Sequence, residues 1–352
     1  EQWLSDDLAY MDDGAVRFRV PTEGVTSWDD LVRGNVSFEN EHIEDFVVRR
    51  ADGTATFFTA NAVDDFDLGI THVVRGEDLI NVTPKVLMLR RALGASDTPE
   101  FAHLPLIVNE QRKKLSKRRD DVALESYRER GVLAPAMINY LALLGWGPPD
   151  DIEVRPIDEI ISLFELTDVN PSSAMFDLKK LEAINAEYIR AMSPEDFSQA
   201  LAPWIKQESW AANVGVEELT TVAPLIQERT KVLSEGPGQL DFFFLADPEF
   251  DEAAWTKVMS ADEAPLILNA VKSAFVEVEW DSAALHETLR SIGEQHGMKL
   301  GKAQAPLRIA VTGRSVGPPL FESMYFLGRE TVVQRIAAAQ QKLDTNKPID
   351  SV

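Results

Sequence analysis

Short apolar runs separated by helical patterns fill the first third of the chain. Three of them, at 46–48, 70–74 and 104–108, are rich in valine, isoleucine and leucine, which is typical of strands buried on both faces. Parallel strands need a long crossover between them, and a helix usually supplies it. The pattern therefore predicts a buried parallel sheet in α/β order.

The segment between the second and third runs predicts a helix with a defined start and end. Thr83 is a suitable N-cap, and Pro84 follows at the first helical position, where its missing N–H leaves no hydrogen bond unmade. Apolar residues then recur at helical spacing, and Gly94 is expected to end the helix.

From about residue 131 the pattern becomes almost wholly helical. Pro135 is expected to open a helix over 136–144, which the glycine- and proline-rich stretch 145–149 ends. One face of this helix is expected to be apolar and to carry Met137, Tyr140, Leu141 and Leu144.

Later helices have clear signals as well. Ser193 and Pro194 predict a capped start for a helix over 197–205. Further helices are predicted at about 216–234, 262–275, 282–296 and 329–342.

Composition sets limits on this picture. A chain of 352 residues with 45% hydrophobic residues is expected to form two or three globular domains. We expect no membrane span and no leader, which favours a cytoplasmic protein. The absence of cysteine excludes disulfides and thiolate metal ligands, and no zinc site is predicted. Because the first residue is Glu1, the chain is expected to be a processed or truncated piece.

Charge is distributed unevenly along the chain. The formal net charge is −23, yet residues 112–119 contain six cationic residues in eight. An acidic chain is not expected to coat nucleic acid in general, because such binding needs many basic side chains on phosphates. The basic run is nevertheless expected to meet a polyanion. A solvated basic turn and a nuclear-localisation-like run are the alternatives.

Two lysines three residues apart in this run suit chemistry on phosphates. The ammonium groups of Lys114 and Lys117 can follow a nucleotide's phosphates and stabilise charge on a pyrophosphate leaving group. Ser116 can donate a hydrogen bond to a phosphate, and Leu115 is expected to anchor the loop. The preceding run at 104–108 would place the loop at the carboxyl edge of the sheet, where ligands of open α/β sheets bind.

Several motifs together identify a family. KLSKR at 114–118 resembles the second signature loop (KMSKS) of class I aminoacyl-tRNA synthetases, and 45–81 is similar to a block of the bacterial glutamyl-tRNA synthetases. On the order and spacing of these and further matches, the chain is identified as a member of the bacterial glutamyl-tRNA synthetases. The first, HIGH-type signature is absent, so we expect the N-terminal part of the enzyme to be missing. The further matches lie at 102–106, 139–146, 176–190, 307–313 and 327–330.

The resemblance implies an α/β plus all-α fold. It predicts the C-terminal half of a Rossmann-type parallel-sheet catalytic domain, then a helical stem-contact region, then an α-helical anticodon-binding domain. The expected ranges are 1–44 for the end of a connective, acceptor-binding insertion, 45–130 for the catalytic half, 131–192 for the stem-contact region and 193–352 for the anticodon-binding domain.

The resemblance also implies site residues in the first half. Phe57, Asn61 and Arg75 are expected at the glutamate substrate, and a guanidinium is a suitable partner for a carboxylate. The family usually has tyrosine at Phe57, so a hydroxyl contact is lost there. Alternatively, Arg75 pairs with Glu77 or Asp78, and Asn61 caps a helix. ATP is expected at Lys114, Leu115, Ser116, Lys117 and Arg118, with Lys114 and Lys117 catalytic.

Two other polar features are expected to be structural. His72 lies in an apolar run and is expected to be a satisfied core residue rather than a catalytic base. Asp64 and Asp65 have no evident third ligand, so a helix end or turn is favoured over a metal pair. No metal site is predicted within the chain.

In the helical half, four residues match positions of the family that contact the anticodon loop: Arg229, Arg308, Pro318 and Leu320. Arg229 is expected to read the third anticodon base, and arginine is well suited to the edges of unstacked bases. Alternatively, Arg229 is a surface residue that pairs with Glu228 or another acid. Packing is favoured over base stacking for three tryptophans, Trp204, Trp210 and Trp255.

The resemblance implies a glutamate–tRNA ligase that activates L-glutamate with ATP and transfers it to tRNA-Glu, with Mg²⁺ accompanying ATP. A monomer without membrane contact is expected. Two alternatives stay open. The missing first signature favours a non-catalytic tRNA-binding module, and a non-discriminating enzyme would also charge tRNA-Gln.

Overall fold

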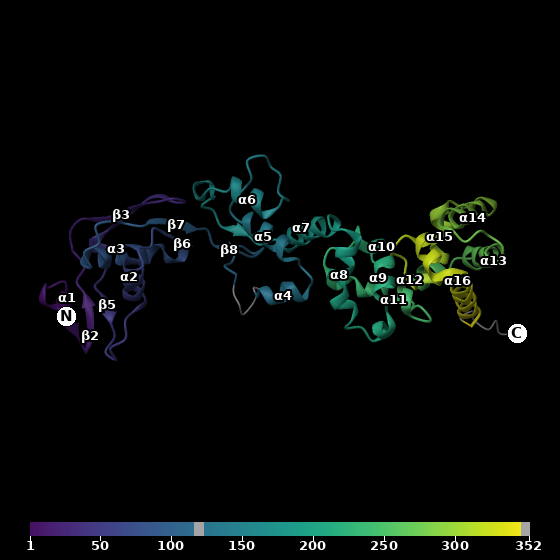
Figure 1. The fold of residues 1–352 in the computed structure, drawn as a ribbon, viewed down its shortest axis with the longest axis horizontal. Helices are drawn as coiled ribbons and strands as arrows, with labels where there is room; N and C mark the ends of the chain where they lie inside the picture. The colour runs from purple at the N-terminus through teal and green to yellow at the C-terminus, as the bar shows by residue number, and fades with distance from the viewer. Residues whose placement is uncertain (116–122, 346–352) are drawn as a thin grey trace. The chain divides into compact units, whose positions relative to one another are not determined.

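The structure is a computed structural model that describes residues 1–115 and 123–345. The chain forms two compact units, which Figure 1 shows with their helices and strands. The first unit comprises Glu1–Ala123 and Met137–Lys180, and the second comprises Leu124–Ala136 and Leu181–Val352. Across the described residues, no helix combines the length and the apolar character needed to cross a membrane.

The first unit contains a four-stranded mixed sheet. Its strand order is β4 (Gly34–Glu39), β3 (Val25–Asp30), β7 (Glu100–Leu104) and β6 (His72–Gly76). Strand β7 runs parallel to both β3 and β6, whereas β3 and β4 are antiparallel. Strand β6 overlaps the run predicted at 70–74, whereas its parallel neighbour β7 shares only Leu104 with the run predicted at 104–108. A strand from the first 44 residues joins this sheet.

The run predicted as one strand at 104–108 is divided. Strand β7 ends at Leu104, and the chain resumes as β8 (Ile107–Val108), which pairs in parallel with β9 (Ala174–Met175). Pro105 lies at the break, where its missing N–H cannot donate to a strand ladder.

The run at 46–48 forms a strand outside the parallel sheet. Strand β5 (Phe46–Arg49) pairs with β2 (Ala15–Phe18), which pairs with β1 (Ala9–Asp12), and both pairings are antiparallel. The prediction of one parallel sheet is therefore wrong for this run. Two short helical segments complete this region, α1 (Gln2–Ser5) and η1 (Asn40–His42).

Helix α3 (Thr83–Ala92) joins the cores of the two sheets. Val86 and Leu89 pack with the antiparallel sheet and with α2 (Phe57–Asp67), whereas Leu87 packs with Trp28 and Phe101 of the mixed sheet. The helix therefore fixes the strands of both sheets against one another.

The start of α3 differs from the prediction. The helical turn η2 (Glu77–Val82) runs directly into α3, so Thr83 has helical backbone angles and Val82 occupies the N-cap position. The predicted cap at Thr83 is wrong, and its hydroxyl is available for other contacts. At the other end, Gly94 has a φ of +89°, which glycine adopts readily, and the helix ends there as expected.

Residues 137–180 complete the first unit. Helix α5 (Ala134–Ala142) ends before Gly145, as predicted, and Met137 and Tyr140 are buried. Leu141 is 41% exposed, so its predicted place on the apolar face is wrong. The remaining helical elements here are α6 (Ile157–Leu163) and η3 (Leu166–Asp168).

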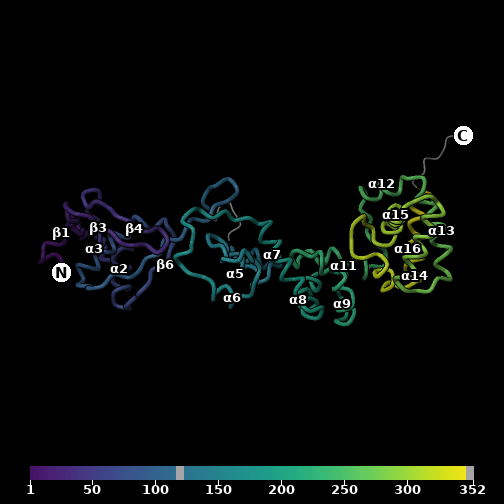
Figure 2. The backbone as a smooth tube through the Cα atoms, turned by 90° about the horizontal axis from the view of Figure 1, so that it is seen from above, coloured from purple at the N-terminus to yellow at the C-terminus, as the bar shows by residue number. Residues whose placement is uncertain are grey.

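The second unit is helical and has two apolar cores. One core is built by α8 to α11 and the other by α12 to α16. Figure 2 shows α13, α14, α15 and α16 side by side, in agreement with their contacts. The elements are α4 (Leu124–Glu129), α7 (Leu178–Arg190), α8 (Pro194–Ile205), η4 (Ser209–Asn213), α9 (Val216–Val222), α10 (Pro224–Gln227), η5 (Leu233–Glu235), α11 (Pro237–Phe244), α12 (Glu252–Met259), α13 (Glu263–Ala274), α14 (Ser282–Gln295), α15 (Leu300–Thr312) and α16 (Leu320–Thr345).

Helix ends in this unit follow local chemistry. The Ser193 hydroxyl accepts a hydrogen bond from the backbone N–H of Asp196, so the predicted cap of α8 is confirmed. The helix predicted at 216–234 is divided and shorter than expected, because Pro224 starts a new helix and that helix ends at Gln227. Helix α16 is interrupted at Gly328, and its part after Gly328 runs to Thr345, in agreement with the helix predicted at 329–342.

Segments that lie far apart in the sequence share sheets and compact units. Strands from 1–44 pair with strands that begin at Phe46 and Glu100, so these segments share two sheets. The helical segment Leu124–Ala136 belongs to the second unit although it precedes 137–180.

Candidate active site and nucleic-acid interface

Arg75 on β6 is the centre of a polar cluster in the first unit. Its Nη2 donates to the Thr83 hydroxyl at 2.7 Å, and its Nη1 donates to the Asn61 side-chain oxygen at 3.4 Å. The Nε donates to Nε2 of His103 at 3.2 Å. The structure thus brings together two of the three residues expected at the glutamate substrate.

Within residues 1–115 and 123–345, no acidic side chain forms an ion pair with Arg75. Both expected partners are engaged elsewhere. Glu77 pairs with Arg33, and Asp78 pairs with Lys114. The alternative in which Arg75 pairs with Glu77 or Asp78 is therefore wrong.

Burial changes the electrostatics of this arginine. Partial burial lowers the pKa of Arg75, and the more distant carboxylates of Asp65 and Asp30 oppose that shift. A half-buried guanidinium without a carboxylate partner is costly to desolvate. An anionic ligand at this place would supply the missing charge.

Asn61 and Phe57 lie on α2, one turn apart. Asn61 is in the interior of the helix, so the alternative that it caps a helix is wrong. Phe57 is 53% exposed and contacts the neighbouring ring of Phe58 edge-on. Its spacing of four residues from Asn61 places both on one helix face.

Three residues behind Arg75 were not expected from the sequence. His103 and Asp30 are fully buried and are hydrogen-bonded to each other, and Thr83 contacts both Arg75 and His103. The pairing of Arg75 with His103 across β6 and β7 sets this cluster. The sequence shows that His103 lies beside an apolar run, but it does not indicate which strand is the neighbour of that run. The contact with Asp30 could therefore not be predicted.

The described part of the basic run extends to residue 115. The Lys114 ammonium donates to Asp78 at 2.7 Å, and this hydrogen bond lowers the pKa of the Asp78 carboxyl. Leu115 donates its backbone N–H to the carbonyl of Ile107, which ties the run to β8. Ser116, Lys117 and Arg118 lie outside the described residues.

The contacts of His72 and of the Asp64–Asp65 pair are those of structural residues. His72 is exposed and lies 3.5 Å from Glu100, so its predicted place in the core is wrong. It alternates along β6 with less exposed residues, as the exposed Val74 does. Asp64 and Asp65 occupy the last turns of α2, where their carbonyls accept hydrogen bonds from Leu68 and Ile70. Within residues 1–115 and 123–345, no group of three or more acidic or histidine side chains is arranged to hold a metal ion.

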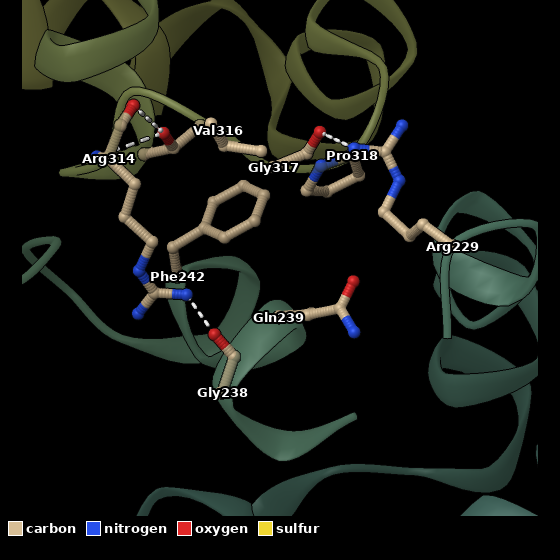
Figure 3. A pocket seen from close by; sticks show the side chains of 9 residues that line it. Arg229, Gly238, Gln239, Phe242, Arg314, Val316, Gly317 and Pro318 are labelled. Carbon is tan, nitrogen blue, oxygen red and sulfur yellow. Dashed lines mark hydrogen bonds between the residues drawn. The ribbon is translucent and has the colours of Figure 1, made fainter. Parts of the chain in front are cut away.

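A pocket of about 300 Å³ lies in the second unit (Figure 3). Its walls combine arginine side chains with apolar and backbone surface, and Val316 is 76% exposed at its lining. The lining residues are Arg229, Gly238, Gln239, Phe242, Thr312, Arg314, Val316, Gly317 and Pro318.

Two arginines bind the backbone of the turn that forms one wall. Arg229 donates to the carbonyl of Gly317, as Figure 3 shows, and Arg308 donates to the carbonyl of Pro318 at 2.8 Å. Burial lowers the pKa of Arg308, and the nearby charge of Arg229 lowers it further. The expected residues Arg229, Arg308 and Pro318 are thus brought together.

The charge of this pocket is only partly balanced. Arg314 pairs with Asp241, whereas neither Arg229 nor Arg308 takes part in any ion pair among the described residues. The alternative in which Arg229 pairs with Glu228 is therefore wrong. The pocket is suited to an anionic or hydrogen-bond-accepting ligand with a flat face that can lie against apolar walls.

Leu320 and the tryptophans support the helices. Leu320 is 1% exposed, so its side chain belongs to the bundle core and not to the pocket wall. Trp255 is buried beside Phe250, Trp204 donates to the carbonyl of Glu129, and Trp210 is stacked on Phe244. The packing role expected for the three tryptophans is confirmed.

Two family models match this chain. The model for class I tRNA synthetases (E and Q), catalytic domain, matches residues 8–183, and an anticodon binding domain model matches residues 196–340. The glutamate–tRNA ligase of Frankia casuarinae is 52% identical over 332 residues, which is 94% of this chain and 70% of that protein. The glutamate–tRNA ligase of Thermobifida fusca is 51% identical over 334 residues, with 94% and 70% covered.

Solved structures resemble this one closely. A glutamate tRNA ligase from Elizabethkingia meningosepticum, in complex with its amino acid, matches with a TM-score of 0.82 and 30% identity. A glutamate–tRNA synthetase from Elizabethkingia anophelis matches with a TM-score of 0.78 and 30% identity. Each match covers 97% of this chain and 70% of the other.

Proposed function

Because the chain belongs to the class I tRNA synthetases for glutamate and glutamine, we propose that it serves as a glutamate–tRNA ligase. Glutamate attacks the α-phosphate of ATP through its α-carboxylate and displaces pyrophosphate. A hydroxyl of the terminal tRNA ribose then attacks the activated carbonyl and releases AMP. The first half of the chain acts in activation, and the helical half binds tRNA.

The unpaired charge of Arg75 is the observation that carries the substrate assignment. Glutamate has two carboxylates, and a guanidinium offers paired N–H donors in the geometry that a carboxylate accepts. We assign Arg75 to the binding of a substrate carboxylate. We assign Asn61, whose side-chain oxygen accepts a hydrogen bond from Arg75 at 3.4 Å, to the same site. Phe57, exposed one turn before Asn61 on α2, would line the same site through its ring.

We assign the phosphate side of ATP to the basic run. Lys114 would exchange Asp78 for phosphate oxygens, since both side chains are about half exposed and their ion pair costs little to open. From the motif, we assign four further residues to ATP binding: Leu115, Ser116, Lys117 and Arg118. Mg²⁺ would arrive with ATP and keep phosphate and water ligands, as this ion usually does.

We assign the arginine-lined pocket to a base of the anticodon. Arg229 and Arg308 already hold backbone carbonyls of the turn at 317–318. The remaining N–H groups of Arg229, which lines the pocket, would donate to a ligand. Phe242 and Val316 offer apolar surface for a base. Leu320 and Pro318 fix the turn, Leu320 through its burial in the core.

Other assignments rest on the resemblance alone. The four domain ranges, with a connective insertion at 1–44 and a stem-contact region at 131–192, are proposals. A cytoplasmic location and a monomeric state are proposals as well. Charging of tRNA-Gln in addition to tRNA-Glu would make the enzyme non-discriminating.

The substrate assignment is tested by measuring binding of L-glutamate, L-glutamine and L-aspartate in the presence of ATP. Wild-type protein is expected to prefer glutamate, and Arg75→Ala is expected to weaken glutamate binding by about ten- to hundredfold, because a charge-assisted hydrogen bond is lost.

Arg19→Ala is the matched control, since it removes an exposed arginine of the same unit that pairs with Asp7. Glutamate-dependent exchange of pyrophosphate into ATP then tests catalysis. Equal affinity for the three amino acids, or unchanged affinity in Arg75→Ala, would overturn the assignment. Binding of tRNA without exchange would favour the non-catalytic tRNA-binding module.

A further inference from the structure

Asp30 and His103 form a buried polar pair behind Arg75. Both side chains have no exposed surface. The Asp30 carboxylate accepts hydrogen bonds from the backbone N–H groups of Val32, Arg33 and His103 on one oxygen. Its other oxygen contacts Nδ1 of His103 at 2.5 Å and Nε1 of Trp28 at 3.3 Å. Burying a carboxylate among so many hydrogen-bond donors costs desolvation free energy, so a role in packing alone does not explain this pair.

The hydrogen bonds fix where the protons lie. Burial alone would raise the pKa of Asp30, but the hydrogen bonds from His103, Val32 and Trp28 outweigh it, so the carboxyl is ionised. Burial lowers the pKa of His103 despite the neighbouring carboxylate, so the ring is neutral near pH 7. Nδ1 therefore holds the proton and donates it to Asp30, and Nε2 presents a lone pair.

That lone pair faces the guanidinium of Arg75. Nε2 of His103 lies 3.2 Å from Nε of Arg75 and 3.1 Å from the Thr83 hydroxyl. The same hydroxyl accepts from Nη2 of Arg75, and it can donate its own proton to Nε2 of His103 or to the Leu79 carbonyl, which lies 3.3 Å away. Arg75 is thus held along one edge by two neutral acceptors, which leaves its full positive charge for a ligand.

We propose that Asp30 and His103 are positioning residues for Arg75, acting by fixing the histidine tautomer that accepts from the guanidinium. The inference rests on the proposed role of Arg75 at the glutamate carboxylate. A carboxylate placed directly on Arg75 would hold it equally well but would neutralise it. The interposed imidazole orients the arginine and keeps the negative charge of Asp30 one residue away.

Two variants of His103 test its contact with Arg75 and its contact with Asp30 separately. In His103→Gln, the side-chain oxygen can stand near the Nε2 position and still accept from Arg75. In His103→Asn, the shorter amide can still donate to Asp30 but offers Arg75 nothing. We expect His103→Asn to weaken glutamate binding by about ten- to hundredfold and His103→Gln to retain most of it.

Asp30→Asn tests the tautomer itself. The new amide would donate to Nδ1 of His103, which would move the ring proton to Nε2 and place it against the N–H of Arg75. We expect the dissociation constant of glutamate to rise about ten- to hundredfold, with that of ATP and tRNA unchanged.

Thr26→Val is the structural control. Thr26 is fully buried on the same strand as Asp30 and is hydrogen-bonded to Asn40 at 2.8 Å, far from Arg75 in the bonding network. This variant is expected to lower stability without changing glutamate affinity. Nitrogen-15 NMR of His103 in the wild-type chain is expected to show a protonated Nδ1 and an unprotonated Nε2.

The outcomes distinguish this inference from the proposed function. If Arg75→Ala leaves glutamate affinity unchanged, the substrate assignment fails and the inference fails with it. If Arg75→Ala weakens binding but Asp30→Asn and His103→Asn behave like Thr26→Val, only the inference fails. A proton on Nε2 of His103 in the wild-type protein would also overturn it.

Discussion

At the scale of single residues, the two candidate sites share one physical feature. Arg75 and Arg229 are both hydrogen-bonded to neutral acceptors, and neither takes part in an ion pair within the described part of the chain. Other arginines of this chain, which has a net charge of −23, pair with an acid, as Arg33 and Arg314 do. An anionic ligand gains the most binding free energy at an arginine that has no acidic partner.

The sequence predicted these arginines but not their partners. The resemblance assigned Arg75 and Asn61 to one site, because the motif fixes their positions along the chain. It did not assign Asp30, which lies 73 residues before His103 and meets it only after β3 and β7 pair. A pairing between distant strands is a tertiary event, and no local pattern contains it.

The Asp30–His103 pair predicts a pH dependence of stability. Because the pKa of His103 is lowered in the fold, the unfolded chain takes up its proton first as pH falls below about 6.5. The contribution of neutral His103 is therefore complete above that pH and is lost on acidification. The groups that act on His103 are Asp30, Arg75 and Arg33.

Urea unfolding at pH 7.5, 6.5 and 5.5 would measure this effect. The free energy of unfolding of wild type is expected to fall toward pH 5.5 by more than that of His103→Gln, with a limiting slope of about 1.4 kcal/mol per pH unit for one proton. Parallel curves for the two proteins would contradict the neutral, buried state of His103.

At the scale of helices and strands, local chemistry was predictable and long-range pairing was not. The Ser193 cap and the end of α3 at Gly94 follow from residue type alone. Strand β5 was predicted as a strand but joins an antiparallel sheet, because its apolar run does not specify a neighbour. Helix α15 was not predicted; Pro306 lies in its interior, and the helix persists there because its apolar residues pack in the core of the bundle.

Gly313 gives an element-scale prediction for the anticodon pocket. It ends α15 with a φ of +77°, and its carbonyl accepts from Asp251. A Cβ at this position would overlap the carbonyl oxygen of Glu249. Gly313→Ala is expected to destabilise the C-terminal bundle by about 3 kcal/mol or more, through backbone strain and steric overlap together.

Gly297→Ala is the matched control in the same bundle. Its φ is +65°, but a Cβ would meet no atom within 4 Å, so a cost of about 1 kcal/mol from backbone conformation alone is expected. Thermal unfolding compares the two variants. Because Thr312 and Arg314 flank Gly313 and line the pocket, only Gly313→Ala is expected to weaken tRNA binding. Equal destabilisation by both variants would contradict this account.

At the scale of the whole molecule, an acidic chain presents positive charge at selected places. The arginine-lined pocket has two arginines in its lining, Arg229 and Arg314, of which Arg314 pairs with Asp241, although the chain as a whole carries −23. Overall acidity repels RNA at long range, so binding must rely on a few specific contacts. We therefore expect discrimination between tRNAs to depend strongly on individual arginines of the second unit.

The composition alone predicted a multidomain globular chain, and the resemblance predicted the family that the comparisons support. It did not predict that residues 1–44 share sheets with the catalytic half, because motif order does not determine how segments pack.

The most direct test of the central claim is binding of the chain to tRNA-Glu and to a copy altered at the third anticodon base, at two salt concentrations. Arg229→Ala is compared with Arg290→Ala, which removes an equal charge from an exposed arginine paired with Glu287 and Glu294. We predict that wild type and Arg290→Ala prefer the natural anticodon by about 1–3 kcal/mol and that Arg229→Ala loses this preference. Equal binding of both RNAs by wild type, or a preference retained by Arg229→Ala, would contradict the account.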